Sequence, residues 1–156
     1  MNDAPKSRGL DPAYLKLFLA LGLSLIVMFA LSMAFIDRWS HFYFNLSNFC
    51  MAVTMVAPMG LIMLLVMRNM FPDKRINAML IVAFVLLFFG GLWLGRTEFA
   101  VGNEQFLKAM IPHHSRAILV CENASITDPD IKTLCDDIVK TQLEEIDQME
   151  QMLDER

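Results

Sequence analysis

The hydrophobic and polar positions divide the chain into an apolar first part and a polar tail with helical periodicity. Three stretches are nearly free of charge and long enough to cross the hydrocarbon core of a bilayer, which takes about 20 residues. They run from Ala13 to Ile36, from Ser47 to Met67 and from Asn77 to Leu94. The pattern therefore predicts three transmembrane helices.

A cleaved secretory signal peptide is the alternative for the first apolar stretch, because Lys6, Arg8 and Lys16 lie at its start. The apolar core of a signal peptide is usually about 7–15 residues long, and this stretch is longer. We therefore interpret it as a retained membrane anchor.

The polar tail has the pattern of two amphipathic helices joined by a short connector. Asn103 can cap the first helix, and Asp128 followed by Pro129 supplies a cap and a first helical residue for the second. Only the residues SITD lie between them, and so short a link makes the helices antiparallel neighbours. The predicted fold class is all-α, with a cytoplasmic segment at 1–12, three transmembrane helices in 13–95, a linker at 96–102 and an extracytoplasmic helical hairpin at 103–156.

Antiparallel pairing around a turn at 126–128 predicts which residues of the hairpin face one another. It sets Cys121 beside Cys135, His114 near 141–142, and Met110 near Glu145. One groove would then collect imidazole, thioether, thiol and carboxylate groups.

Charge separates the two parts of the chain. Residues 1–95 carry seven Lys or Arg and four Asp or Glu, whereas residues 96–156 carry six and thirteen. Short loops on the cytoplasmic side of a membrane carry an excess of Lys and Arg. In this chain the basic residues gather before the first span and between the second and third. We expect a multi-pass protein of a bacterial inner membrane whose tail is periplasmic. Its acidic tail would repel nucleic-acid phosphates, so no nucleic-acid partner is expected.

Two of the tail's methionines and its two adjacent histidines form a candidate metal site: Met110, His113, His114 and Met149. Imidazole binds several transition metals, whereas the soft thioether favours Cu(I). Methionines at helical spacing also commonly fill hydrophobic cores, so a polar core without metal stays open as the alternative. Pro112 is expected to kink the helix, turning His114 into the groove and His113 toward its rim.

The two tail cysteines allow three interpretations. In an oxidising compartment, Cys121 and Cys135 would form a disulfide that closes a loop of about 15 residues and contributes roughly 3 kcal/mol in the chain-entropy model. They could instead be paired thiolates that bind a soft metal, or inert buried thiols. Cys50, in the second apolar stretch, is interpreted as a packing residue.

The runs FLKAMIPHHSRAI and TDPDIKTLCDDIVKTQLEEIDQM closely resemble the bacterial family known as domain of unknown function 305, over about residues 103–153. The hallmarks of that family are an MIPHH segment, a DPEI-like helix start and an EI.QM ending. The resemblance implies ferritin-like helical packing and a periplasmic copper-handling domain. Its motif positions correspond to Met110, His113, His114 and Met149, with a copper ion as the bound cofactor.

The second apolar stretch carries a row of methionines spaced four residues apart, which forms a slowly winding stripe on a helix. An adaptable helix contact and a Cu(I) relay are the two interpretations of this stripe. Gly91 and Gly95 predict close packing of the third span. The row consists of Met51, Met55, Met59, Met63 and Met67.

These features together predict a membrane-anchored copper chaperone, buffer or resistance factor. It would contact lipid, self-associate and meet copper transport or efflux proteins. The alternative is a structural module that oligomerises through the hairpin, because two helices bury little apolar surface alone. No glycine-rich phosphate loop, nucleophile constellation or di-iron Glu-x-x-His motif is present in the sequence, so no enzymatic activity is expected.

Overall fold

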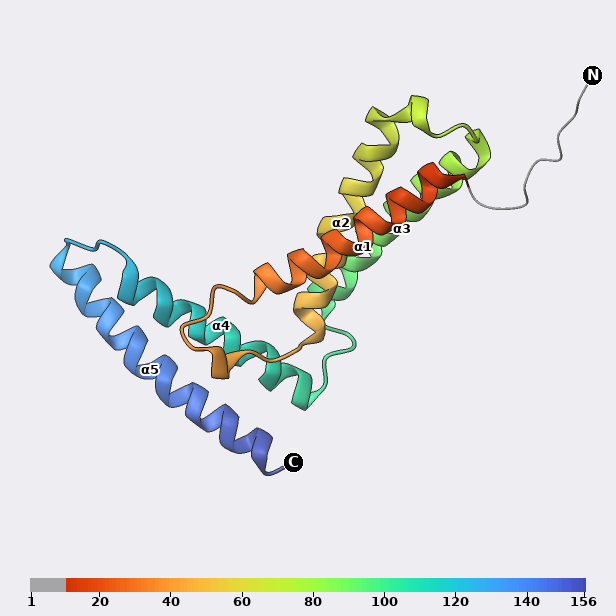
Figure 1. Cartoon of the computed structure of the whole chain (residues 1–156). Coiled ribbons are helices and arrows are strands. Elements are labelled where there is room, and N and C mark those ends of the chain that lie inside the picture. The colour runs from red at the N-terminus through yellow and green to blue at the C-terminus, as the bar shows by residue number, and fades with distance from the viewer. Residues whose placement is uncertain (1–10) are drawn as a thin grey trace, which may run out of the picture.

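The computed structural model describes residues 11–156, and within them the chain is all-helical, which confirms the predicted fold class. The long helices of the first part of the chain gather in one bundle, and the helices of the tail form a hairpin at one end of it (Figure 1). The predicted cytoplasmic segment, with Lys6 and Arg8, lies almost entirely outside the described residues. The helices are α1 (Pro12–Ser32), η1 (Trp39–His41), α2 (Leu46–Val66), η2 (Arg68–Met70), α3 (Lys74–Thr97), α4 (Asn103–Asn123) and α5 (Pro129–Asp154).

Helices α1, α2 and α3 are each long and apolar enough to cross a membrane. Their bounds follow from local chemistry. The Asp73 carboxylate accepts the N–H groups of the first turn of α3, so that helix begins three residues before the predicted span. Helix α1 ends four residues before the predicted Ile36, because Met33 and Ile36 leave the helix and are buried in the loop that follows. The result is a chain with three candidate spans and a structured loop between the first two.

Helix α2 lies in the middle of the bundle and packs against both α1 and α3. The core between them includes Tyr14 and Leu17 of α1 and Phe84 of α3. Tyr14 is completely buried, and its hydroxyl donates to Oδ1 of Asn77 at 2.8 Å. This bond fixes the start of α1 against the start of α3.

Two glycines allow the close approach of α2 and α3. A Cβ atom at Gly60 would lie 2.6 Å from the Phe84 ring, and one at Gly91 would overlap the Thr54 hydroxyl. The predicted role of Gly91 is therefore confirmed, whereas that of Gly95 is wrong, because a Cβ atom there would meet nothing within 4 Å. Gly95 instead borders a small pocket that it shares with Leu46 and Cys50 of α2.

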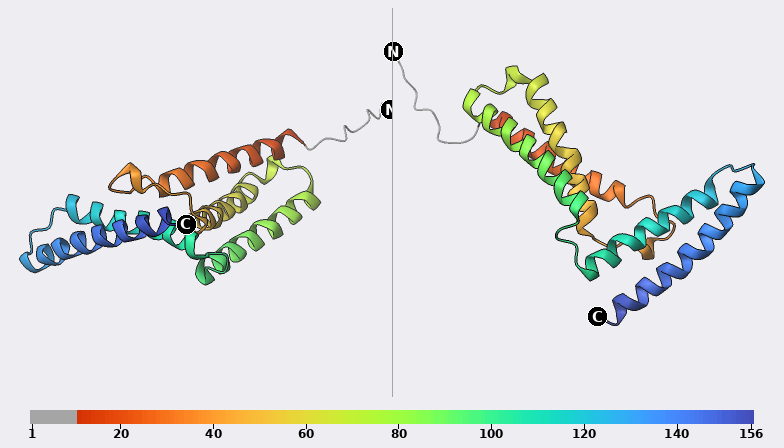
Figure 2. Two further views of the ribbon diagram at one scale, coloured as in Figure 1. Left: turned by 90° about the horizontal axis from the view of Figure 1, so that it is seen from below. Right: turned by 180° about the vertical axis from the view of Figure 1, so that it is seen from behind.

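Helices α4 and α5 form the predicted antiparallel hairpin, which lies roughly crosswise to the three-helix bundle (Figures 1 and 2). Asp128 caps α5 as expected, since its carboxylate accepts the N–H groups of Asp130 and Ile131. Asn103 is the first residue of α4 rather than its cap; Gly102 takes that position without a side-chain bond. The core of the hairpin consists of Leu107, Ile111, Ile118, Ile146 and Met149.

The α1–α2 loop is packed against the hairpin. Ser115 of α4 is completely buried; its hydroxyl accepts the N–H of Asp37 at 2.7 Å and lies 2.9 Å from Nδ1 of the buried His41. Tyr43 packs against the hairpin core, and the side chain of Gln105 accepts the N–H of Leu46 at 2.9 Å. The hairpin is thus held to the bundle by this loop as well as by the connection that follows α3.

Exposed aromatic side chains gather where the bundle meets the hairpin. Trp39 and Phe44 lie in the α1–α2 loop, Trp93 lies near the end of α3, and Phe99 follows that helix. Aromatic residues are enriched at the interfaces between a membrane and water. Their position is consistent with the hairpin lying at one face of a membrane.

Candidate metal centre

The buried face of α4 determines where the two adjacent histidines point. Ile111, Ser115 and Ile118 recur at helical spacing and are all buried. Successive residues on a helix point about 100° apart, so His113 and His114 lie on different sides. His114 is half-buried and faces α5, whereas His113 is exposed; their ring centroids are 6.0 Å apart.

His114 has an unusual electrostatic position. Its Nδ1 lies 3.0 Å from Oε2 of Glu145, yet the two atoms are not aligned for a hydrogen bond. Nδ1 of His114 is the one buried side-chain nitrogen or oxygen atom of residues 11–156 that lacks a hydrogen-bond partner. Burial lowers the pKa of His114 and the nearby His113 lowers it further, while Glu145 acts in the opposite direction. The ring is therefore held toward its neutral form, which has a free lone pair.

The Glu145 contact also corrects the predicted register of the hairpin. That carboxylate was expected opposite Met110, but it lies against His114, one turn further along α4. The side chain of Gln142, expected beside His114, donates to Glu145 at 3.3 Å instead. Facing positions on two helices advance in steps of three or four residues, so the pairing shifts as the helices run away from their turn.

The two candidate methionines lie on opposite helices of the hairpin. Met149 of α5 is buried in the hairpin core, and the half-buried Met110 of α4 packs against the same cluster. Met110 also lines a cavity on the other side of α4. The four candidate ligands are therefore divided between the hairpin interior and this cavity.

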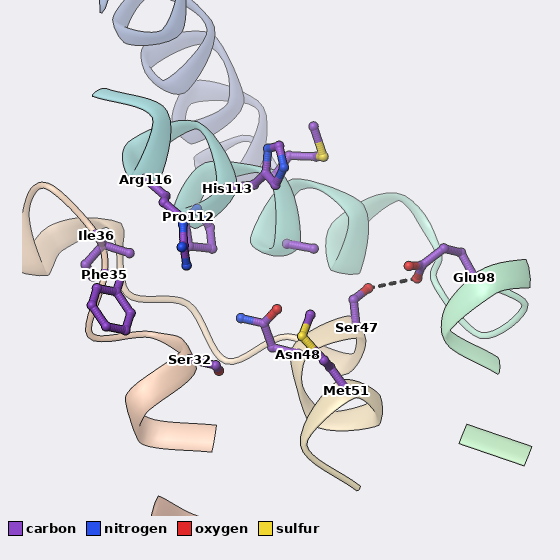
Figure 3. A pocket seen from close by; sticks show the side chains of 12 residues that line it. Ser32, Phe35, Ile36, Ser47, Asn48, Met51, Glu98, Pro112, His113 and Arg116 are labelled. Atoms are coloured by element: carbon purple, nitrogen blue, oxygen red, sulfur yellow. Dashed lines mark hydrogen bonds between the residues drawn. The ribbon is translucent and has the colours of Figure 1, made fainter. Parts of the chain in front are cut away.

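The cavity lies at the junction of the hairpin and the bundle and has a volume of about 490 Å³. Figure 3 shows Pro112 and Arg116 facing it from α4, with the His113 ring on the side of that helix away from α2, and Asn48 and Met51 lining the opposite wall from α2. Ser47 of α2 donates to a carboxylate oxygen of Glu98 at 2.8 Å at its edge. We refer to this space as the junction cavity.

Cys121 and Cys135 are joined by a disulfide beside the hairpin turn, with their Cα atoms 5.3 Å apart. The bond links the last full turn of α4 to the second turn of α5. It leaves Cys50 of α2 as the free cysteine of the chain. The tail thiols are thus absent from the donors that face His114.

The methionine row of α2 divides in two. Met51 and Met55 are exposed, whereas Met59, Met63 and Met67 pack against the core of the bundle. This division follows from the slow winding of a four-residue repeat around a helix. Met51 differs from the other four because it faces the junction cavity.

Sequence patterns did not identify Ser115 and His41 as a structural pair, although the cluster they form is buried. Seventy-four residues separate them in the chain, and a serine within a helix has no distinctive signal. The one clue was that an apolar helix face with Ile111 and Ile118 places a polar residue at position 115. The lining role of Met51 was also missed, because nothing in the sequence shows which helix end meets α4.

No group of three or more His, Cys, Asp and Glu side chains is placed to hold a metal ion in the described part of the chain. The available donors are of another kind: imidazoles and thioethers, with single carboxylates nearby. Such a set suits a soft ion of low coordination number better than a hard cation, which prefers several oxygen ligands.

Comparison with known proteins gives a family and a viral relative. Residues 94–153 match the family described as "Domain of unknown function (DUF305)". The chain is also 30% identical over 115 residues to "Uncharacterized protein L153" of Acanthamoeba polyphaga mimivirus, which covers 72% of this chain and 73% of that protein. No solved structure matches the chain. The alignment with the viral protein is longer than the matched domain, so the similarity includes part of the helical bundle.

Proposed function

Because the chain belongs to the DUF305 family through its C-terminal domain, we propose that it is a membrane-anchored protein that binds copper as Cu(I) through α4 and α5. Its role would be that of a copper chaperone, buffer or resistance factor. The protein would hold and release the ion without catalysing a reaction.

The unpartnered Nδ1 atom of His114 carries this proposal. A buried ring nitrogen without a hydrogen bond costs about 1–3 kcal/mol, and a bound cation would offset that cost. Metal binding requires neutral imidazole, and burial favours that form by lowering the pKa of His114. Met149, buried between the same two helices, supplies the soft thioether that favours Cu(I) over harder ions.

The four motif residues would act in two pairs. His114 and Met149 would serve the hairpin interior, with Glu145 beside the ring offsetting the charge of the ion. Met110 and His113 lie toward the junction cavity. Both histidines could bind one ion only after a rearrangement, since successive residues of a helix point about 100° apart. The bound Cu(I) ion would be the cargo of the protein, and soft ligands would let it be exchanged with a partner.

A competition titration tests the proposal on the full chain in detergent micelles. Ascorbate keeps copper reduced, and bicinchoninic acid reports the Cu(I) that the protein does not hold. We expect His114→Ala and Met149→Leu to weaken binding by at least about tenfold, as loss of even an outer-shell partner does. Met152→Leu is the control, because Met152 lies on α5 outside the core cluster. Failure of the wild-type protein to bind Cu(I) would refute the function.

The proposed location is a bacterial inner membrane, with the hairpin in the periplasm. The segment that joins α2 to α3 lies at the end of the bundle away from the hairpin (Figure 1). It carries Arg68, Lys74 and Arg75, which supports this orientation. A reporter enzyme that works only outside the cytoplasm should be active when it is fused after Arg156. Activity of a cytoplasm-dependent reporter at that site would reverse the orientation.

Self-association through the hairpin is a second candidate function. Val120, Ile131 and Leu134 are each more than half exposed near the hairpin turn. Exposed apolar residues that lie close together are typical of protein interfaces. Sedimentation of the detergent-solubilised chain should then show a dimer or larger species, and Leu134→Glu should shift it toward monomer. A wild-type protein that sediments as a monomer at all concentrations would exclude this function.

A further inference from the structure

We propose that the junction cavity binds the headgroup of a zwitterionic phospholipid that carries a phosphate and a primary ammonium group. The phosphate would lie at Arg116 of α4, and the ammonium at Glu98, beside the end of α3. The inference goes beyond the proposed function and does not depend on copper. It makes one membrane lipid a bridge between the hairpin and the three-helix bundle.

The junction cavity has the size and the position of a headgroup site. Its volume of about 490 Å³ falls within the range of roughly 300–1,000 Å³ that is typical of small-molecule sites. Its walls come from the ends of α1 and α2, which are candidate membrane spans, and from α4 of the hairpin. The exposed aromatic residues of the α1–α2 loop lie at this end of the bundle, as expected at the boundary between membrane and water. Phospholipid headgroups occupy that same boundary.

Arg116 is a cation without an anionic partner. Within residues 11–156 its guanidinium forms no ion pair and no hydrogen bond, and it lies 5.3 Å from the centroid of the Phe35 ring. Stacking on an aromatic face leaves the N–H groups at the edge of a guanidinium free to donate. Those five donors form a planar fork that matches the oxygens of a phosphate. Arg116 is therefore the phosphate-binding group of the cavity.

Glu98 is a carboxylate at a position that disfavours one. It follows the last residue of α3 with a φ of 47°, and it is the one non-glycine residue with positive φ in the described part of the chain. Glycine or asparagine usually fills that position, and the negative end of the helix dipole repels a carboxylate there. The Ser47 hydroxyl donates to Glu98 at 2.8 Å, but no ion pair compensates its charge within residues 11–156. A bound ammonium group would offset both the charge and the dipole.

The two charged groups lie at opposite ends of the cavity, with Asn48 and Ser47 on the wall between them (Figure 3). The amide nitrogen of Asn48 donates to the Met33 sulfur, whereas its carbonyl oxygen has no hydrogen-bond partner within residues 11–156 and is a second acceptor for an ammonium. A headgroup with separated charges of opposite sign fits this arrangement. An anionic headgroup would set negative charge against Glu98, and a quaternary ammonium has no N–H to donate.

Apolar side chains continue from the cavity along α2. Phe35 and Met51 line the cavity and are each more than half exposed. Met55 lies one turn further along α2, is 51% exposed and extends the same face of the helix. The acyl chains would lie along this face, where flexible thioethers adapt to a partner of irregular shape. The exposed part of the methionine row would then serve lipid contact.

Native mass spectrometry of the metal-free full chain in detergent tests the proposal by counting bound lipids. The probes are phosphatidylethanolamine, phosphatidylcholine and phosphatidylglycerol with identical acyl chains, each added at the same concentrations. Arg116→Gln removes the cation, and Glu98→Gln removes the negative charge while keeping an acceptor for the Ser47 hydroxyl. Arg96→Gln is the control, because Arg96 is exposed in the last turn of α3 but does not line the cavity.

We expect the wild-type protein and Arg96→Gln to bind one phosphatidylethanolamine at least about tenfold more tightly than the other two lipids, as the strength of charged hydrogen bonds implies. Arg116→Gln should weaken all three lipids, because each contains a phosphate. Glu98→Gln should weaken phosphatidylethanolamine alone and so remove the preference. General attraction of lipid to a charged surface would not produce this difference between the two variants.

Several results would overturn the proposal. Equal binding of the three lipids by the wild type would exclude the headgroup site, and so would equal losses in Arg116→Gln and Arg96→Gln. If water-soluble glycerophosphoethanolamine binds as tightly as the lipid, the cavity serves a soluble phosphate ester instead. Arg116 and Glu98 are both exposed, so their substitution disturbs no packed core, and unchanged circular dichroism should confirm that the variants fold.

Discussion

Replacing Ser115 with alanine should release the α1–α2 loop from the hairpin. The Ser115 hydroxyl is completely buried and takes part in two hydrogen bonds, with the N–H of Asp37 at 2.7 Å and with Nδ1 of His41 at 2.9 Å. Alanine fills nearly the same space but can neither accept nor donate. Both loop groups would then be left without their partner in a buried site.

The magnitude follows from the two bonds. Each contributes about 0.5–1.5 kcal/mol, and an unsatisfied buried donor costs about 1–3 kcal/mol. A loss of about 2 kcal/mol corresponds to an increase of roughly 30-fold in the equilibrium for local opening of the loop. The effect should be confined to the loop, since α4 and α5 keep their apolar core and their disulfide.

Hydrogen exchange measured by mass spectrometry on the detergent-solubilised chain is the suitable assay. Peptides covering residues 33–45 should exchange faster in Ser115→Ala by about the predicted factor, while peptides from α5 should not change. Ser125→Ala is the control, because Ser125 is exposed in the hairpin connector. Protection of the loop within about threefold of the wild type would show that the Ser115 bonds do not hold it, and would refute the reasoning.

Three further changes test other parts of the structure. Gly60→Ala should lower the melting temperature, because overpacking against Phe84 costs about 1–3 kcal/mol, whereas Gly22→Ala has open space and should be tolerated; equal melting of the two variants would contradict the packing. Changing Cys121 and Cys135 together to alanine should destabilise the oxidised protein by about 3 kcal/mol. If mass spectrometry of the unreduced, alkylated wild type finds both thiols modified, the disulfide does not form. Burial lowers the pKa of His114, so below about pH 6.5 the unfolded state binds more protons than the folded state, and the metal-free protein should lose stability as the pH falls from there to the folded pKa. Thermal melts at pH 7.5 and 5.5 should show this loss. The same loss in His114→Gln would rule out His114 as its source.

Local and periodic features of the fold were predictable from the sequence. Long apolar stretches predicted α1, α2 and α3, and the Asp128 and Pro129 pair predicted where α5 begins. These signals lie within one helix or its cap, so they need no knowledge of tertiary packing. The short SITD connector likewise predicted the antiparallel hairpin.

The arrangement of the candidate site was less predictable, because it depends on how α4 meets the bundle. Sequence spacing grouped Met110, His113, His114 and Met149, but it could not show that His113 lies at the edge of the junction cavity while His114 lies against Glu145. The division results from burial of the Ile111 and Ile118 face, which fixes the rotation of the helix. A contact across 74 residues, such as that of Ser115 with His41, leaves no periodic trace in the chain.

The packing of the α1–α2 loop against α4 has a consequence for the biogenesis of the protein. Proteins are made from the N-terminus onward, at about 5–20 residues per second, so the loop is synthesised well before Ser115 exists. Until then His41 and the N–H of Asp37 lack the partner that they have in the finished fold. The segment between α1 and α2 therefore completes its structure only after the hairpin has been translated and has packed against it. A ribosome that stops after α3 would release a chain that has all three candidate spans but whose α1–α2 loop stays open.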